Sequence, residues 1–145
     1  MIVYLDASAL VKRYVAEASS PVVVSLIMKA DAIGTAAISR AEVSAALGKA
    51  TRMKILKRDE AASALQVFTA DWENLIRLQI TEVLIARASA LAWDHGLRGY
   101  DAVHLAAAVF WQEMLSEPVT LATFDRQLWH GASVAGLIAW PESEP

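Results

Sequence analysis

The strongest constraint on the fold is the apolar run from Leu97 to Trp111, LRGYDAVHLAAAVFW. Between Asp101 and Trp111 the only polar side chains are those of Asp101 and His104. A helix that is apolar on nearly every face belongs in the interior of a domain. Asp101 stands in its first turn, where an acid either faces the positive end of the helix dipole or contributes to a metal site. The choice depends on whether other acids of the chain can meet Asp101.

The composition is that of one globular domain. The chain has 145 residues, of which 56% are hydrophobic and 20% charged, and this excludes a disordered protein. No apolar run approaches the ~18 residues of a membrane span, and no basic leader precedes Asp6. The absence of cysteine excludes disulfides, thiolate metal sites and cysteine nucleophiles, and suits a reducing compartment. We expect a cytoplasmic protein without a membrane partner, with one domain over residues 1–140 and a frayed tail at 141–145.

Charge is unevenly distributed along the chain. The net charge is −3, but residues 1–60 hold nine basic and six acidic side chains, whereas residues 61–145 hold four and ten. Within the first part, five basic residues fall inside ten positions: Lys49, Arg52, Lys54, Lys57 and Arg58. Such a run is either a solvated helix end or a contact for phosphates or an acidic partner.

Short β-rich runs alternate with helical patterns. Strands are expected at 2–5, 32–38, 75–80, 119–122 and 134–140. Helices are expected at 7–15, 21–29, 39–50, 59–72 and 82–95, then through the central run, with a short helical turn at 126–129. Thr81 is predicted to cap the helix that Gly96 ends. The alternation predicts a three-layer α/β/α sandwich around a mainly parallel sheet.

Three acids share one placement in this arrangement. Asp6, Glu42 and Asp125 each lie just past the carboxyl end of a predicted strand. In an open parallel sheet those ends converge on one crevice, which Asp101 can also reach. Each acid also has a local explanation: Asp6 and Asp125 can be helix N-caps, and Glu42 has capping-box spacing from Ser39.

Bringing four carboxylates together needs a compensating charge. Two carboxylates 4 Å apart repel by roughly 4 kcal/mol at an effective dielectric of 20. Protons or a hard divalent cation must offset this, and an all-oxygen ligand set suits Mg²⁺ or Mn²⁺. The residues therefore allow a metal site at the crevice.

Other chemistries fit less well. A phosphoaspartate hydrolase would need a second Asp where Ser8 stands, and neither a phosphate-binding glycine loop nor an H-E-x-x-H motif is present. The histidines are scattered. His104, one turn from Asp101, either points at the crevice or, as we favour, is a hydrogen-bonding helix residue near its rim.

Four segments carry the acids: MIVYLDASALVKRY, SRAEVSAAL, GYDAVHLAAA and LATFDRQL. In this order and spacing they resemble the PIN-domain family, and within it the VapC-type toxins of toxin–antitoxin pairs. The resemblance covers essentially the whole chain and implies a small α/β/α nuclease domain that cleaves single-stranded or looped RNA with a metal. It implies a set of acids and supporting hydroxyls at Asp6, Glu42, Asp101 and Asp125, with Ser8 and Thr123.

The resulting hypothesis is an endoribonuclease dependent on Mg²⁺ or Mn²⁺. Asp6 and Asp101 are the first choices for direct metal ligands. Glu42 and Asp125 could be ligands, could orient metal-bound water, or could serve a second metal. The candidates for contacts to the RNA backbone are Arg98, Lys49, Arg52 and Lys54. The alternative is a non-catalytic RNA- or protein-binding module that keeps the fold.

Two protein partners are also expected. The resemblance implies a small cognate antitoxin, which could present an Arg to the acid cluster. A homodimer is expected because several helical positions are apolar beyond the needs of one small core: Val22, Val23, Leu26, Leu56 and Leu65.

Overall fold

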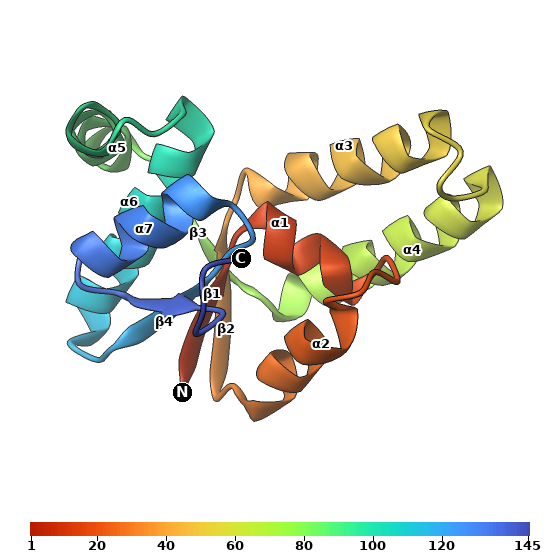
Figure 1. The fold of residues 1–145 in the computed structure, drawn as a ribbon, viewed down its shortest axis with the longest axis horizontal. Coiled ribbons are helices and arrows are strands. Elements are labelled where there is room, and N and C mark those ends of the chain that lie inside the picture. The colour runs from red at the N-terminus through yellow and green to blue at the C-terminus, as the bar shows by residue number, and fades with distance from the viewer.

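Five strands form the centre of the molecule, in the order β3-β2-β1-β4-β5 (Figure 1). In this computed structural model, which describes residues 1–145, the strands are β1 Ile2–Leu5, β2 Ala32–Ala36, β3 Ile76–Leu78, β4 Val119–Ala122 and β5 Ile138–Trp140. Every neighbouring pair is parallel. The carboxyl ends of all five strands therefore lie along one edge of the sheet.

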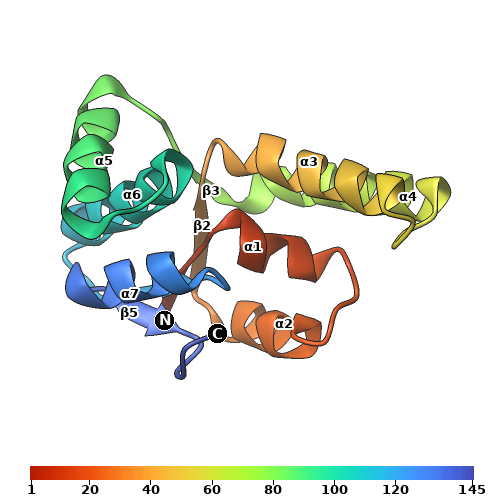
Figure 2. The same cartoon turned by 45° about the horizontal axis from the view of Figure 1, so that its top comes forward.

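Helices cover both faces of the sheet (Figure 2). The N-terminal part of the chain forms α1 Ala7–Leu10, the 3₁₀ turn η1 Val11–Arg13, α2 Ser20–Lys29, α3 Ser39–Arg52, α4 Arg58–Asp71 and the 3₁₀ turn η2 Trp72–Asn74. The C-terminal part forms α5 Glu82–His95, α6 Gly99–Leu115 and α7 Arg126–Val134. The predicted three-layer α/β/α sandwich is confirmed, and its sheet is parallel throughout.

Alternation along β1 divides the apolar core in two. Val3 and Leu5 point into the cluster under α1 to α4, whereas Tyr4 points into the cluster under α5 to α7. Both faces of the strand are covered, which explains why its sequence is a continuous apolar run rather than an alternating one.

The central helix α6 is buried along most of its length, as predicted. Trp111 lies so close to β2 that a Cβ placed on Gly34 would come within 2.6 Å of the indole ring. The backbone of β2 can approach the helix only because this residue has no side chain. Trp111 is therefore a packing residue of the core.

Most predicted elements are confirmed, with shifted ends. Thr81 accepts the N–H of Leu84 and Gly96 ends α5 in the left-handed conformation, both as expected. The expected short turn after Asp125 is wrong, because α7 continues to Val134. Since α7 takes the start of the expected strand 134–140, β5 begins only at Ile138.

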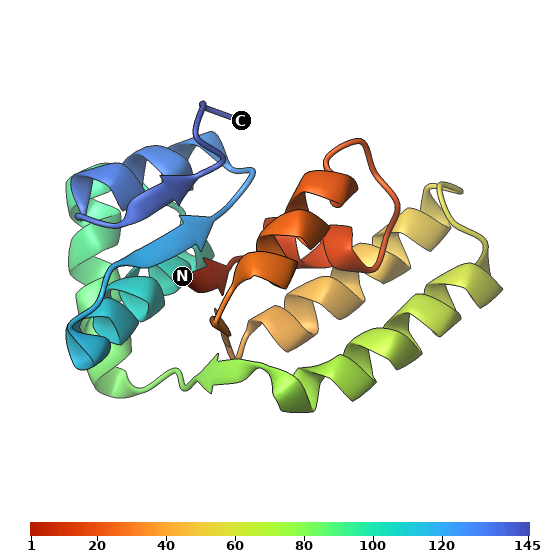
Figure 3. The ribbon, with the colours of Figure 1, turned by 90° about the horizontal axis from the view of Figure 1, so that it is seen from below.

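Helices α3 and α4 form a long hairpin that reaches away from the sheet (Figure 3). The basic run of the sequence lies at its far end, in the last turn of α3, the connecting turn and the start of α4. Lys49, Arg52 and Lys54 are all exposed there.

The predicted apolar surface is only partly present. Val22 is 53% and Leu65 37% exposed, but Val23 and Leu26 belong to the buried core, so their assignment to the surface was wrong. Both side chains are buried in α2, and Leu26 joins the apolar cluster that contains Val3 and Leu5.

Two hydrogen bonds hold the C-terminal tail against α7. The indole N–H of Trp129 donates to the carbonyl oxygen of Pro141 at 2.8 Å, and Arg126 donates to that of Pro145 at 2.9 Å. The tail that the sequence predicts to fray is thus in contact with α7. None of the helices combines the length and apolarity that crossing a membrane would require.

Candidate active site

The four acids singled out by the sequence come from four elements at the carboxyl edge of the sheet. Asp6 follows β1 and caps α1, and Asp125 follows β4 and caps α7. Glu42 stands in the first turn of α3 and Asp101 in the first turn of α6. The N-cap predictions for Asp6 and Asp125 are confirmed by the bonds they accept from Ala9 N–H and Leu128 N–H, both at 2.9 Å.

Asp6 is held by two hydroxyls. Ser8 Oγ lies 2.7 and 2.9 Å from the two carboxylate oxygens, and Thr123 Oγ1 donates to Oδ2 at 2.7 Å. The same hydroxyls accept backbone N–H groups of the loop after β4: Ser8 from Phe124 at 2.9 Å, and Thr123 from Asp125 at 3.0 Å. The two hydroxyls therefore connect the acid at the end of β1 to the loop that carries the acid at the end of β4.

The charge on Asp6 is costly to maintain in this position. Only 3% of the residue is exposed, and burial raises the pKa of its carboxyl above the usual value. Hydrogen bonds from Thr123, Ser8 and the N–H of Ala9 favour the charged form and offset part of that rise. Binding a cation would relieve the same cost.

Arg98 bridges the second pair of acids. Its Nε donates to Asp101 Oδ2 at 2.9 Å, and its Nη2 donates to Asp125 Oδ2 at 2.6 Å. The sequence prediction assigned Arg98 to RNA, but in the structure its guanidinium is engaged by two carboxylates. It neutralises charge where three acids approach one another.

Asp101 remains an unusual acid despite this ion pair. Burial raises the pKa of its carboxyl, the hydrogen bond from Arg98 lowers it, and the charges of Asp125 and Asp6 raise it again. Arg98 engages only Oδ2. Oδ1 of Asp101 accepts no hydrogen bond from the protein. It is not fully buried either, so it can bind a ligand.

Glu42 is held by a buried chain of hydrogen bonds. Its Oε1 lies 2.7 Å from His104 Nε2, and His104 Nδ1 lies 2.7 Å from Tyr4 Oη. Tyr4 Oη also accepts the backbone N–H of Ala36 at 3.1 Å. This chain runs from β2 through β1 and α6 to α3, across the carboxyl edge of the sheet.

Counting donors assigns the protons in this chain. Burial, and then the charge of Asp6, raise the pKa of Tyr4 well above its usual value, so the hydroxyl keeps its proton. A buried hydroxyl proton needs an acceptor, and the partner that the structure offers to Tyr4 Oη besides the N–H of Ala36 is His104 Nδ1, so Tyr4 donates to it. His104 Nε2–H then donates to the carboxylate of Glu42, which fixes both the tautomer and the carboxylate orientation.

Two predictions about these residues are wrong. His104 does form hydrogen bonds, but it is 1% exposed and lies in the interior rather than near a rim. Glu42 forms no capping box with Ser39, because the N-cap of α3 is Ile38 rather than Ser39. No side chain caps this helix. The hydroxyl of Ser39 instead pairs with Thr35 Oγ1 at 2.6 Å, and Thr35 donates to the carbonyl of Leu5 at 2.7 Å.

The predicted backbone contacts in the basic run lie apart from this site. Glu42 and Arg52 are ten residues apart on α3, which corresponds to about 15 Å at 1.5 Å per residue. Lys54 lies farther still along the hairpin. Conversely, no local pattern links Tyr4 to His104, which stands 100 residues away, so Tyr4 was not predicted at the site.

The chemistry of the donor set fits a hard divalent cation, although the present arrangement is open. No three acid or histidine side chains converge closely enough to hold a metal ion as they stand. The free Oδ1 of Asp101 and the burial of Asp6 nevertheless favour a cation there, provided that Arg98 yields part of its hold on the acids. Asp6, Asp101, Glu42 and Asp125 are the residues that would hold it.

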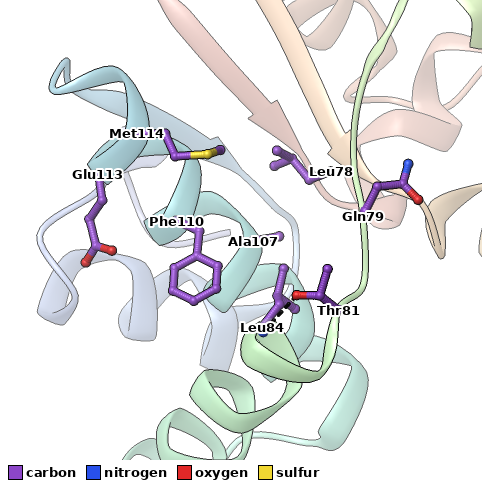
Figure 4. A pocket seen from close by; sticks show the side chains of 8 residues that line it. All are labelled: Leu78, Gln79, Thr81, Leu84, Ala107, Phe110, Glu113 and Met114. Carbon is purple, nitrogen blue, oxygen red and sulfur yellow. Dashed lines mark hydrogen bonds between the residues drawn. The ribbon is translucent and has the colours of Figure 1, made fainter.

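A separate apolar hollow of about 520 Å³ lies beside α5 and α6 (Figure 4). Its walls include Leu78, Phe110 and Met114, with Glu113 at its margin. None of the four acids lines this hollow, so it is distinct from the acid cluster.

Comparison with known proteins agrees with this geometry. The family model described as PIN domain matches residues 3–132. The protein named Ribonuclease VapC45 of Mycobacterium tuberculosis is 36% identical over 136 residues, covering 93% of this chain and 92% of that protein.

Two solved structures share the fold. The crystal structure of PAE2754 from Pyrobaculum aerophilum has a TM-score of 0.66 at 21% identity, covering 96% of this chain and 89% of that one. VapBC2 from Rickettsia felis, bound to a DNA fragment from its promoter, has a TM-score of 0.65 at 17% identity, covering 96% and 97%. At these identities the two structures support the fold assignment and nothing beyond it.

Proposed function

The chain belongs to the PIN-domain family, and on that premise we propose that it is a metal-dependent endoribonuclease, the toxin of a toxin–antitoxin pair. The observation that carries the proposal is the gathering of four carboxylates from four elements at one edge of the sheet. Two of them, Asp6 and Asp101, are buried and have pKa values raised by their surroundings. The relative named VapC45 is called a ribonuclease, which supports RNA as the substrate.

The side chains divide the work at the scissile phosphodiester. Mg²⁺ or Mn²⁺, when bound, would polarise the phosphoryl oxygens and lower the pKa of a bound water. Asp6 and Asp101 would hold the cation, and Ser8 and Thr123 keep the Asp6 carboxylate in place. Glu42, oriented by His104, accepts a proton from the attacking water or orients it. Asp125 holds Arg98 beside the reacting phosphate, where the guanidinium can take up negative charge.

The simplest test compares cleavage of a mixed RNA pool with and without EDTA. Purified protein should cleave RNA with Mg²⁺ or Mn²⁺, lose activity in EDTA and regain it when the metal is restored. The Asp101→Asn variant, purified in parallel, controls for contaminating nucleases. RNA binding without cleavage in any of these conditions would instead establish the non-catalytic binding module.

We further propose that a small antitoxin covers the acid cluster. Arg98 lies between Asp101 and Asp125, so an Arg of an inhibitor that takes its place can bind the same two acids by the same chemistry. The test is expression of the chain in the cytoplasm, alone and with the neighbouring short reading frame. Growth arrest should occur only when the chain is expressed alone, and harmless expression of an active enzyme would exclude the toxin role.

A homodimer remains part of the proposal. Val22 and Leu65 are exposed apolar side chains on two different helices, and a second copy would cover one such face. Sedimentation of the purified chain should give a mass near twice 15.7 kDa. A single species near 15.7 kDa at micromolar concentration would exclude a stable dimer.

A further inference from the structure

A polar hollow of about 490 Å³ lies beside the acid cluster and plays no part in the chemistry proposed above. Arg40 from the first turn of α3 and Arg77 from β3 both line it, together with the amide side chain of Gln79. Trp72 and Leu75 form its apolar wall. Two arginine residues therefore line one hollow.

Neither guanidinium is strongly engaged within the protein. Arg40 is exposed and forms no ion pair; its guanidinium lies 6.0 Å from the centre of the Trp72 ring, which supports one side of it. Arg77 has one partner, Glu73 at 3.3 Å, whose side chain is 72% exposed. An ion pair with so exposed a partner is weak, so a ligand can displace it.

The hollow and the candidate active site lie along the same carboxyl edge of the sheet, since Ala37 and Gln79 follow β2 and β3. Ala37, which lines it, directly follows β2, and its N–H donates to the carbonyl oxygen of Leu78 at the end of β3. Arg40 stands two residues before Glu42, so the two side chains leave α3 on different sides. An RNA strand that leaves the acid cluster and crosses the start of α3 would meet Arg40 next.

We propose that this hollow binds a backbone phosphate of the RNA flanking the phosphate that is cleaved, with Arg40 and Arg77 as its ligands. This inference rests on the proposed ribonuclease function. Guanidinium groups suit phosphate because they offer paired N–H donors in a fixed plane. The site also adds local positive charge that holds a polyanion in a protein of net charge −3.

The hollow replaces the basic run of the hairpin as the place where the RNA backbone is held. Arg40 and Arg52 are twelve residues apart on α3, about 18 Å along the helix axis. Arg52 therefore provides a matched control: the same residue type on the same helix, exposed, but remote from the acid cluster.

The test is the salt dependence of RNA binding. A short single-stranded RNA of mixed sequence is titrated with the Asp101→Asn protein, in which the strand stays intact, at several salt concentrations. Each phosphate contact contributes about 0.7 to the slope of log K against log salt for single strands. Replacing both ligands together, Arg40→Gln with Arg77→Gln, should lower the slope by about that amount in total, whereas Arg52→Gln with Arg58→Gln should leave it unchanged.

A charge-preserving variant separates charge from geometry. Arg40→Lys should retain the slope but bind RNA less tightly at every salt concentration, because it keeps the charge and loses the paired donors. An unchanged slope for Arg40→Gln with Arg77→Gln, in a protein that binds RNA, would overturn this inference and leave the ribonuclease proposal intact. The inference would also be overturned if the same substitutions lowered the salt dependence of antitoxin binding but not that of RNA binding, because the hollow would then be the site of an acidic protein. If the parent protein binds no RNA at any salt concentration, the proposed function fails and this inference with it.

Discussion

Helix α3 has two ends with opposite surroundings. At its first turn Ser39 is fully buried, Glu42 is bonded to a buried histidine, and the helix is tied to the sheet. At its last turn Lys49 and Arg52 are exposed and only the partner helix α4 lies alongside (Figure 1). One helix thus carries a rigid polar site at one end and a solvated basic cluster at the other.

The difference between the two ends shows that position relative to the sheet is a better guide to functional residues than the local density of charge. The basic run attracts attention in the sequence because five positive charges stand close together. The first turn carries a single acid and a single arginine, yet this turn stands at the edge where the parallel strands end. Functional side chains should therefore be found at the inner end, and substitutions can test that.

The largest effect on RNA cleavage is expected from the acids near the first turn of α3, Asp6 and Asp101. Asp6→Asn and Asp101→Asn should each lower RNA cleavage by more than about 100-fold, because loss of a partner that merely supports a metal ligand already costs 10- to 100-fold. Rates are compared on one RNA under saturating Mn²⁺, with folding checked by circular dichroism.

Asp94→Asn is the matched control, since Asp94 is an exposed acid near the end of α5. It should cleave at the rate of the unmodified chain. Near-normal cleavage by Asp6→Asn or Asp101→Asn would remove that residue from the catalytic set.

The acids could be found in the sequence because the signal for each is local. A run such as Ile2–Leu5 predicts a buried strand, and the acid after it must then lie at the carboxyl edge. The ion pair of Arg98 with Asp125 spans 27 positions, and the bond of Tyr4 with His104 spans 100, so neither leaves a local pattern.

The capping box failed for the same reason. Ser39 and Glu42 have the right spacing, but spacing carries no information about burial. Once Ser39 is buried beside Thr35, the hydroxyl bonds there, and Glu42 is free to bond His104. Long-range packing overrode a local preference that was physically sound by itself.

The second prediction concerns the buried chain behind Glu42. Tyr4→Phe should destabilise the protein by roughly 1–3 kcal/mol for each of the two groups it leaves without a partner, the N–H of Ala36 and Nδ1 of His104. It should also lower cleavage by about 10-fold, because His104 no longer has a fixed tautomer with which to orient Glu42. Urea unfolding and single-turnover cleavage measure the two effects.

A double-mutant cycle separates positioning from stability. If Tyr4 acts on cleavage through Glu42, Tyr4→Phe should cost no further activity in the Glu42→Gln background, while its effect on unfolding persists. Additive losses of activity would show that the chain supports the fold without orienting Glu42.

The third prediction is stabilisation by metal. A cation that binds only the folded protein stabilises it by about 2.7 kcal/mol at 100 times its dissociation constant. For a domain of this size that corresponds to roughly 5–10 °C in melting temperature. Differential scanning calorimetry in Mn²⁺ should show the shift, and Asp6→Asn should abolish it. A melting temperature that is indifferent to millimolar Mn²⁺ would contradict the metal site.

A smaller effect is expected from pH in the metal-free protein. Asp6 and Asp101 have folded pKa values above their usual 3.8, so the folded state binds protons more tightly than the unfolded state does. These groups therefore stabilise the protein at low pH, and that contribution is lost as pH rises from about 4 through the raised pKa values. Asp101→Asn should become more stable relative to the unmodified chain over that window, as measured by urea unfolding in EDTA. A relative gain by the unmodified chain as pH rises would reverse the assigned direction.

The smallest effect is expected at the outer end of α3. Arg52→Gln and Lys49→Gln should change the free energy of unfolding by less than about 0.5 kcal/mol, because both side chains are exposed and neither forms an ion pair. Cleavage of RNA should also stay within about twofold, since these residues lie some 10–15 Å along the helix from Glu42. Urea unfolding and steady-state cleavage at low and physiological salt give both numbers. A loss of cleavage confined to low salt would show that the end of the hairpin attracts the RNA at long range. It would then support the prediction from sequence that the basic run contacts the RNA backbone.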